Sequence, residues 1–359
     1  MRDRPDGFGE RELRLALAEG WQIRAVTTRY APVGGGSYHW VVRDDRGERW
    51  FATVDDLDVK AWLGDSRSMV LAGLRRAMNT ALALRRDARL PFVLAPEPAS
   101  GGDTVRPGGV RHAVAVFRFA RQPAGQFGQA LSGGERNALT DMLAALHQAT
   151  PAVAAGAPVA PIGLPLRETL EAALGELSRP WRGGPFAEPA RALLAGTAGQ
   201  VGQLLRAFDR MTGPVAAREP VISHGEPHPG NILGTGNHRL LIDWDTVGLA
   251  PPERDLWMVA GEQVRRYTRL TGRSVEPAML AWYRLRWALD DISAFVHQLR
   301  SGHRRTADAE HAWRSLQDTV ARAIREPPAD WYPRLTNGRV TDARAASCGN
   351  IVDNFVGYF

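Results

Sequence analysis

The chain has 359 residues, of which 44% are hydrophobic, with a formal net charge of +6 and a single cysteine, Cys348. This size supports a substantial core in roughly two domains or lobes, and one cysteine excludes an internal disulfide framework and favours a reducing, cytoplasmic location. The sequence has no apolar run of roughly 18 residues, no apolar signal-peptide core and no basic run interleaved with aromatic residues, so we expect no membrane and no nucleic acid as partner.

The N-terminal elements alternate between one short helix and several strands. A helix over Arg11–Glu19 is indicated by two leucines on one face. Strands are predicted over Ile23–Tyr30, Trp40–Val42 and Arg49–Val54, with a turn at 44–47 between the last two.

A glycine loop, Gly34, Gly35, Gly36 and Ser37, lies between the first two predicted strands. Glycines let backbone N–H groups approach a phosphate closely, and a run of such groups forms an anion-binding concavity. A triple glycine is equally typical of a flexible turn. The glycine run alone does not distinguish a phosphate-binding loop from a flexible turn.

The next segment completes the first half of the chain. Apolar residues at helical spacing predict a helix over Ser66–Arg86. Residues Pro91–Pro98 and Ala99–Gly109 combine a predicted strand with a Pro/Gly turn, and Arg111–Phe119 alternates as a strand. Residues 120–125 then link the two halves.

The second half is mostly helical in pattern. Ser132 and Glu135 predict a capping box for a helix that ends at Ala149, and an Ala/Pro connector follows at 151–165. Further helices are predicted over Pro165–Leu177, Glu188–Arg210, Asp255–Thr271, Pro277–Arg300 and His311–Arg325. The tail 337–359 lacks periodicity and is interpreted as an appendage.

The stretch VISHGEPHPGNILGTGNHRLLIDWD, residues 221–245, concentrates carboxylates and an amide on short apolar strands. If the strands at Ile232 and Leu240 pair as a hairpin, Asn231 and Asp243 lie near each other at its open end. Glu226 in the preceding Pro/Gly loop then faces the same point. Two carboxylates and one amide converge.

Such a set of oxygen atoms suits Mg²⁺, which takes one or two carboxylates and completes its shell with phosphate oxygens and water. Phosphoryl transfer needs such a metal and a carboxylate that orients an incoming hydroxyl. A surface hairpin with acidic ends is the alternative that spacing alone leaves open.

His224-Gly225-Glu226-x-x-x-x-Asn231 and Ile242-Asp243-Trp244-Asp245 resemble the catalytic loop and metal-binding segment of the aminoglycoside phosphotransferase family, relatives of the protein kinases. The continuation, residues 250–256, resembles the spectinomycin phosphotransferase branch. The resemblance implies that Glu226 is the base, where the family usually has Asp, and that Asn231 and Asp243 bind Mg²⁺. It implies loop-supporting roles for His224 and Asp245.

The same resemblance gives the first half of the chain a function. It implies that the glycine loop (Gly34, Gly35, Gly36, Ser37) covers the triphosphate of ATP or GTP. It also implies that backbone groups near the link between the lobes bind adenine, with Phe117–Arg121, including Phe119, as the adenine edge.

The third strand departs from the family pattern, because Thr53 or a neighbour stands where relatives carry a phosphate-binding lysine. Lys60, the sole lysine, or Arg75 or Arg76 supplies the missing charge by another route, or the nucleotide is held loosely and turnover is slow or lost. A solvated surface position is the alternative for Lys60.

Acceptor binding is assigned to the helix over 277–300. Helical spacing puts Asp291 on the stripe of Trp287 and other aromatic residues, and turns Asp290 about 100° away. Asp291 either pairs with an arginine, because an unpaired buried charge is costly, or faces the substrate together with Asp290 and Trp282, Tyr283 and Trp287. The second arrangement suits a cationic, hydroxylated ligand.

Together these patterns predict an α/β (α+β), protein-kinase-like fold with a nucleotide-binding lobe at 1–119, a helical lobe at 120–336 and a tail at 337–359. The expected function is Mg²⁺-dependent transfer of the γ-phosphoryl group of ATP or GTP to a hydroxyl of an aminoglycoside-like antibiotic or related metabolite. A degenerate nucleotide-binding protein, or one with a macromolecular partner, remains as an alternative.

Overall fold

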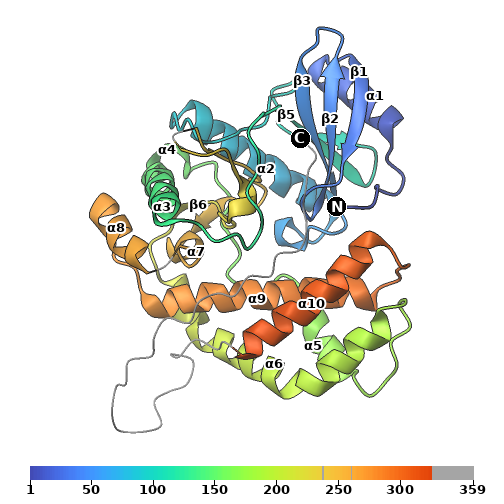
Figure 1. Cartoon of the computed structure of the whole chain (residues 1–359), viewed down its shortest axis with the longest axis vertical. Coiled ribbons are helices and arrows are strands. Elements are labelled where there is room, and N and C mark those ends of the chain that lie inside the picture. Colours follow the sequence, from blue (N-terminus) through green and yellow to red (C-terminus); the bar gives the residue numbers. More distant parts are fainter. Residues whose placement is uncertain (237, 260, 326–359) are drawn as a thin grey trace.

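The structure is a computed structural model that describes residues 1–236, 238–259 and 261–325. A small part built on one antiparallel sheet lies beside a larger helical part (Figure 1). The expected α/β fold of kinase-like type is therefore confirmed. The predicted tail at 337–359 lies outside the described residues. Among the helices that the structure describes, none is long and apolar enough to cross a membrane.

The small part is a five-stranded sheet in the order β1-β2-β3-β5-β4. Its strands are β1 (Ala25–Ala31), β2 (Ser37–Asp44), β3 (Arg49–Asp56), β4 (Arg106–Gly108) and β5 (His112–Arg118). One face packs on α1 (Glu10–Trp21), where Leu13 and Leu17 meet Trp40 of β2. The other face packs on α2 (Arg67–Arg86), whose buried residues cluster with Phe117 of β5. The sheet thus has a core on each side.

The strand predicted within 91–109 is confirmed as β4, and no strand forms at 91–98. Only an isolated bridge between Val93 and Leu241 forms there. Three prolines in this segment, Pro91, Pro96 and Pro98, remove backbone donors that a strand ladder needs.

The larger part begins after a connecting segment at 119–132. Its helices are α3 (Gly133–Gln148), α4 (Thr150–Val153), α5 (Arg167–Gly175), α6 (Ala187–Ala216), α7 (Glu253–Leu256), α8 (Glu262–Thr271), α9 (Pro277–Arg300) and α10 (Ala307–Arg325). The predicted capping box of α3 is present. The single helix predicted over Asp255–Thr271 is wrong, because α7 and α8 are separated by Gly261, whose φ of 98° is outside the helical region.

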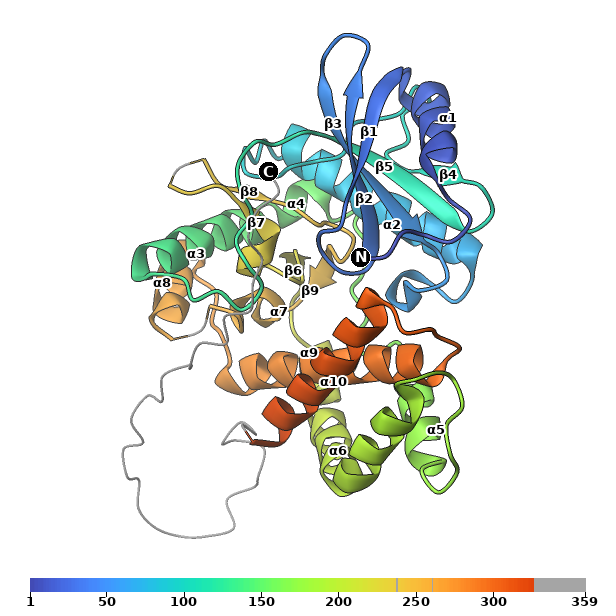
Figure 2. The ribbon, with the colours of Figure 1, turned by 45° about the vertical axis from the view of Figure 1, so that its right-hand side comes forward.

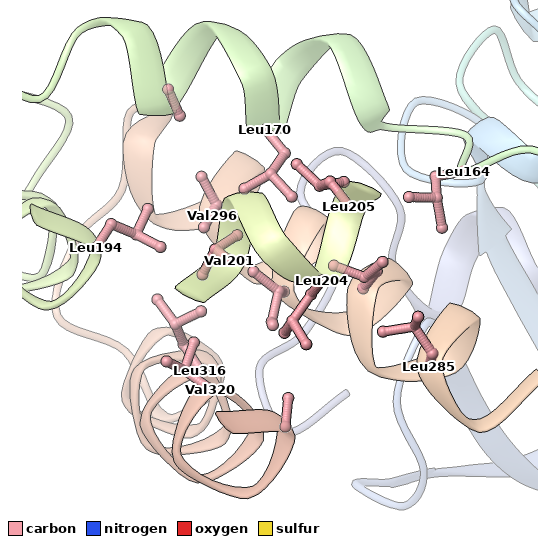
Figure 3. Close-up of a cluster of buried hydrophobic side chains, with 14 of the residues drawn as sticks. Leu164, Leu170, Leu194, Val201, Leu204, Leu205, Leu285, Val296, Leu316 and Val320 are labelled. Atoms are coloured by element: carbon pink, nitrogen blue, oxygen red, sulfur yellow. The ribbon is translucent and has the colours of Figure 1, made fainter. Parts of the chain in front are cut away.

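Helices α5, α6, α9 and α10 share one apolar core, which contains Leu170, Val201, Val296 and Leu316 (Figure 3). Burial of this many aliphatic side chains stabilises the packing of the four helices. The core gives α9 a fixed position, and α9 carries the predicted acceptor residues.

The predicted central strands form two short ladders. β6 (Val221–Ser223) pairs with β9 (Gly248–Ala250), and β7 (Ile232–Leu233) pairs with β8 (Leu240–Leu241). A 3₁₀ turn over Pro229–Asn231 precedes β7. Figure 2 shows β6 and β9 in the middle of the molecule, between the small sheet and α9.

Candidate active site

Glu226 lies in the loop that follows β6, half-buried and held through its backbone. Its N–H donates to Nδ1 of His224 at 3.2 Å, and its carbonyl oxygen accepts from Nδ2 of Asn231 at 3.0 Å. Burial, followed by the negative charge of Asp245, raises the pKa of the Glu226 carboxyl to about 7. A carboxyl with this pKa can take up a proton near neutral pH.

His224 is a fully buried support of this loop. Its Nε2 donates to the carbonyl oxygen of Ile242 at 2.8 Å, while Nδ1 accepts from Glu226. This pattern requires a neutral imidazole with its hydrogen on Nε2. Burial lowers the pKa of His224 to about 4, in agreement with that tautomer.

Asp255 of α7 fixes the same loop from below, a contact that the sequence patterns did not reveal. Its carboxylate accepts from the backbone N–H groups of His224 at 2.8 Å and Gly225 at 2.7 Å. It also meets Nε2 of His147 at 3.0 Å. His147 is thus a buried structural residue, in agreement with its position beside the apolar face of α3.

Gly225 is required by both conformation and space. Its φ is 102°, and a Cβ atom there would lie 2.4 Å from Nη2 of Arg254. The Arg254 guanidinium itself donates to Oγ of Ser223 at 2.9 Å and to the carbonyl oxygen of Thr246 at 2.8 Å. The loop therefore follows the arginine closely, and a side chain at Gly225 would displace one of them.

Asn231 and Asp243 lie at the open end of the β7–β8 hairpin. The register pairs Ile232 with Leu241, and the N–H of Ile242 donates to the carbonyl oxygen of Asn231 at 3.0 Å. The expected proximity of the two residues follows from this register. Asn231 gives its amide N–H to Glu226, which leaves its amide oxygen as a donor for a cation.

Asp243 has a left-handed backbone, with φ at 65°, and its side chain is exposed to solvent. The surrounding protein and the charges of Asp245 and Glu226 raise the pKa of its carboxyl well above the usual range. A bound cation at this place would relieve their repulsion.

The donor set for a metal is small. In the part of the chain that the structure describes, no group of three or more His, Cys, Asp or Glu side chains is arranged to hold an ion. Asn231 and Asp243 would provide two oxygen ligands, a set that suits Mg²⁺ if nucleotide phosphates and water complete the shell.

Asp245 binds the only lysine of the chain. Nζ of Lys60 lies 2.6 Å from Oδ2 of Asp245, 3.0 Å from Oδ1 of Asp55 and 3.2 Å from Oγ of Ser37. The side chain is 1% exposed, so the alternative of a solvated surface lysine is wrong. The neighbouring carboxylates raise the pKa of Lys60 despite its burial. All three N–H donors face protein oxygens, so Lys60 connects Ser37 of the glycine loop and Asp55 of β3 to Asp245, which follows β8.

The other proposed substitutes for the strand lysine lie on α2. Nε of Arg75 donates to the carbonyl oxygen of Val105 at 3.1 Å, and its guanidinium lies 3.8 Å from Asp103. Arg76 is exposed. Thr53 occupies the strand position itself and contacts Nδ1 of His39 at 3.3 Å.

A pocket of about 420 Å³ lies where the small part meets the connecting segment. It is lined by Leu94, Arg118, Phe119, Ala120, Arg121, Gln122 and Leu240. The predicted adenine edge falls on this pocket. The guanidinium of Arg49 covers the Phe119 ring at 3.6 Å from its centroid.

On α9, the two carboxylates that were predicted to bind the acceptor differ in whether they have an ion-pair partner. Asp290 pairs with Arg286 at 2.7 Å. Asp291 is half-buried and has no hydrogen bond or ion pair to any residue that the structure describes, and burial together with the charge of Glu226 raises its pKa well above the usual range. An unpaired carboxylate near Glu226 is suited to a cationic ligand.

An aromatic wall, Phe127, Trp257 and Trp287, stands on the same side of the molecule. The rings of Phe127 and Trp287 stack at 5.6 Å, and Trp257 meets Trp287 at 5.6 Å. Phe127 and Trp257 were not identified from the sequence. The expectation that Trp282 and Tyr283 receive a ligand is wrong, because they are 1% and 5% exposed within the core around α9.

Comparisons with known proteins agree with this geometry. The model of a family described as the phosphotransferase enzyme family (APH) matches residues 29–295. Protein StrN of Streptomyces griseus is 32% identical over 138 residues, 37% of this chain and 41% of StrN, so the match spans well under two thirds of that relative.

Two solved structures share the fold. Spectinomycin phosphotransferase APH(9)-Ia, in complex with ADP and spectinomycin, has a TM-score of 0.68 at 15% identity, covering 88% of this chain and 98% of that one. Amicoumacin kinase, in complex with AMP-PNP and Ca²⁺, has a TM-score of 0.51 at 13% identity, covering 90% and 96%. These solved structures therefore show that the chain has the same fold. From its family match over most of its length, the chain belongs to the phosphotransferase enzyme family.

Proposed function

We propose that this protein is a small-molecule kinase that transfers the γ-phosphoryl group of ATP, or of GTP, to a hydroxyl of an aminoglycoside-like antibiotic or related metabolite. The observation that carries the proposal is the arrangement of Glu226 beside Asn231 and Asp243, with the pKa of Glu226 raised to about 7. The family match supports the reaction type.

In the proposed reaction, the oxygen of the acceptor hydroxyl forms a bond to the γ-phosphorus while the bond to the β–γ bridging oxygen breaks and the nucleoside diphosphate leaves. Glu226 orients the hydroxyl and takes its proton. Mg²⁺, held by Asn231 and Asp243, would neutralise charge on the phosphates. His224 and Asp255 keep the loop in place, because both bind its backbone.

The acceptor is proposed to be cationic as well as hydroxylated. Asp291 offers an unpaired carboxylate near Glu226, and the aromatic wall beside it favours contact with a cation. An aminoglycoside or aminocyclitol has this chemistry. The solved relative that contains spectinomycin supports the same class.

A degenerate nucleotide-binding protein with little transfer activity is the second candidate. It is favoured by two observations, Thr53 in place of a strand lysine and the extra methylene of Glu226. About 1 Å of misplacement can matter for catalysis.

The test is ATP consumption in the presence of Mg²⁺ with a panel of aminoglycosides, aminocyclitols and hydroxylated metabolites. We expect wild-type protein to turn over with at least one cationic acceptor, and Asp243→Asn to lose that activity. Nucleotide binding without turnover on any acceptor would favour the second candidate. Full activity of Asp243→Asn would contradict the metal assignment.

A further inference from the structure

One side chain beneath the glycine loop has no role in the site described so far. His39 on β2 pairs in register with Thr53 on β3. Its neighbour Trp40 points into the core against α1, so His39 projects from the opposite face of the sheet. That face carries Ser37, which ends the glycine loop.

The imidazole of His39 is held in one orientation. Nδ1 lies 3.3 Å from Oγ1 of Thr53, and the ring stacks on Phe51 with centroids 5.0 Å apart and planes at 25°. Nε2 has no hydrogen-bond partner among the described residues. A Cβ atom on Gly34 would lie 3.5 Å from it, so Nε2 is directly under the glycine turn.

Charge and hydrogen bonding fix the protonation of this ring. Burial, then the positive charges of the Met1 amino group and Lys60, lower the pKa of His39 to about 3. The ring is neutral, and the Thr53 hydroxyl can donate to Nδ1, an arrangement that leaves the ring hydrogen on Nε2. A hydroxyl both donates and accepts, so Thr53 also satisfies Nδ1 when an approaching anion favours the protonated ring.

The sole lysine does not provide a free donor at this place, since its three N–H groups meet Asp245, Asp55 and Ser37. Backbone N–H groups of a glycine loop can bind an anion, and a side-chain donor beside that loop would add a further contact to a phosphate. Nε2 of His39 is oriented for that contact.

We propose that His39 binds the phosphate chain of the nucleotide through its Nε2–H, with Thr53 as the positioning residue that holds the ring. This inference rests on the proposed nucleotide site and adds to it the residue pair that takes the place of a strand lysine.

The test compares affinities for ATP and adenosine by calorimetry in three variants. His39→Leu removes the donor and keeps the bulk, His39→Gln keeps an N–H donor, and Thr53→Val removes only the hydroxyl. A hydrogen bond to a charged group corresponds to about a tenfold change in affinity or more. We expect His39→Leu to weaken ATP binding about tenfold with adenosine unchanged, and His39→Gln and Thr53→Val to lose less.

His297→Leu is the matched control, because His297 is exposed on α9. If His39→Leu binds ATP like wild type, or weakens ATP and adenosine equally, the inference is wrong. In either case the wild-type protein tests the proposed function separately: no binding of ATP to wild type would contradict the nucleotide site, and ATP binding without turnover on any acceptor would favour the degenerate candidate.

A second measurement uses the wild-type protein, so it does not depend on how the variants fold. With ¹⁵N-labelled histidine, the Nε2 signal of His39 should shift on addition of ATP and not of adenosine, and His39→Gln assigns the signal by its loss. The same shift with both ligands, or with neither, would overturn the proposal.

Discussion

The chemistry of Glu226 depends on its surroundings as much as on its identity. The spacing from His224 to Asn231 located it in the sequence, and the burial that raises its pKa to about 7 comes from packing that no spacing reveals. The backbone of its loop is fixed by the side chains of Asn231 and His224. The sequence therefore predicted which residue lies at this position, but it did not predict the raised pKa of its carboxyl.

Glu226→Gln is expected to lower kcat by about 100-fold or more, because the variant cannot take up the acceptor proton. Affinity for nucleotide should stay unchanged. In wild type, kcat should fall as pH decreases through about 7, since the base must be ionised. Steady-state rates across pH provide the measurement, and a flat profile over this range would argue against Glu226 as the base.

The same substitution has a consequence for stability. The folded-state pKa of Glu226 is raised, so the folded protein binds its proton more tightly than the unfolded chain does, and stability decreases as pH rises from 4.5 towards about 7. Glu226→Gln removes this effect. Its melting temperature should exceed that of wild type above pH 7 and match it in acid, where Glu226 is protonated in both states.

At the scale of elements, local patterns predicted the β7–β8 hairpin and the capping box of α3 correctly. Local patterns did not predict features that depend on contacts between residues far apart in the sequence. The carboxylate of Asp255 meets a loop 30 residues away in sequence, and Trp282 donates to the carbonyl oxygen of Phe208 in the helical core. Periodicity gives the face of a helix that is buried, and it does not say which buried face lines a site.

Gly225→Ala tests how the loop depends on α7. The added Cβ meets the guanidinium of Arg254 at 2.4 Å and forces a side chain into a φ of 102°. We expect a stability loss of about 1–3 kcal/mol and a clear decrease in kcat, since Glu226 is the next residue.

Gly199→Ala in α6 is the control, because nothing lies within 4 Å of its added Cβ. This variant should be about 0.5–1 kcal/mol more stable than wild type. Urea unfolding and turnover measure both effects, and equal behaviour of the two variants would refute this account.

At the scale of the whole molecule, a few polar contacts join the small sheet to the helical part. Asp308 at the start of α10 accepts from the backbone N–H groups of Arg2 at 2.8 Å and Asp3 at 2.9 Å. Lys60 makes a second connection, because it binds Asp55 on β3 and Asp245 beyond β8. The Lys60 connection joins Ser37, at the end of the glycine loop, to the segment that follows β8.

Of these two connections, the Lys60 connection has the larger effect on stability when it is broken, since its charged groups are buried. Lys60→Met leaves Asp55 and Asp245 without a counter-charge, and removal of one partner from a buried ion pair costs about 3–5 kcal/mol. That is a large part of the about 5–15 kcal/mol that stabilises a domain. The KM for ATP should rise as well, because Ser37 and Asp245 lose the lysine that both of them contact.

Lys60→Met/Asp245→Asn should be less destabilised than Lys60→Met alone, since the double variant has one unpaired buried charge fewer. Arg86→Met, which removes an exposed ion pair with Asp87, should change neither the stability nor the KM. A Lys60→Met protein with wild-type stability and KM would mean that the sheet and the segment around Asp245 are held together without this lysine.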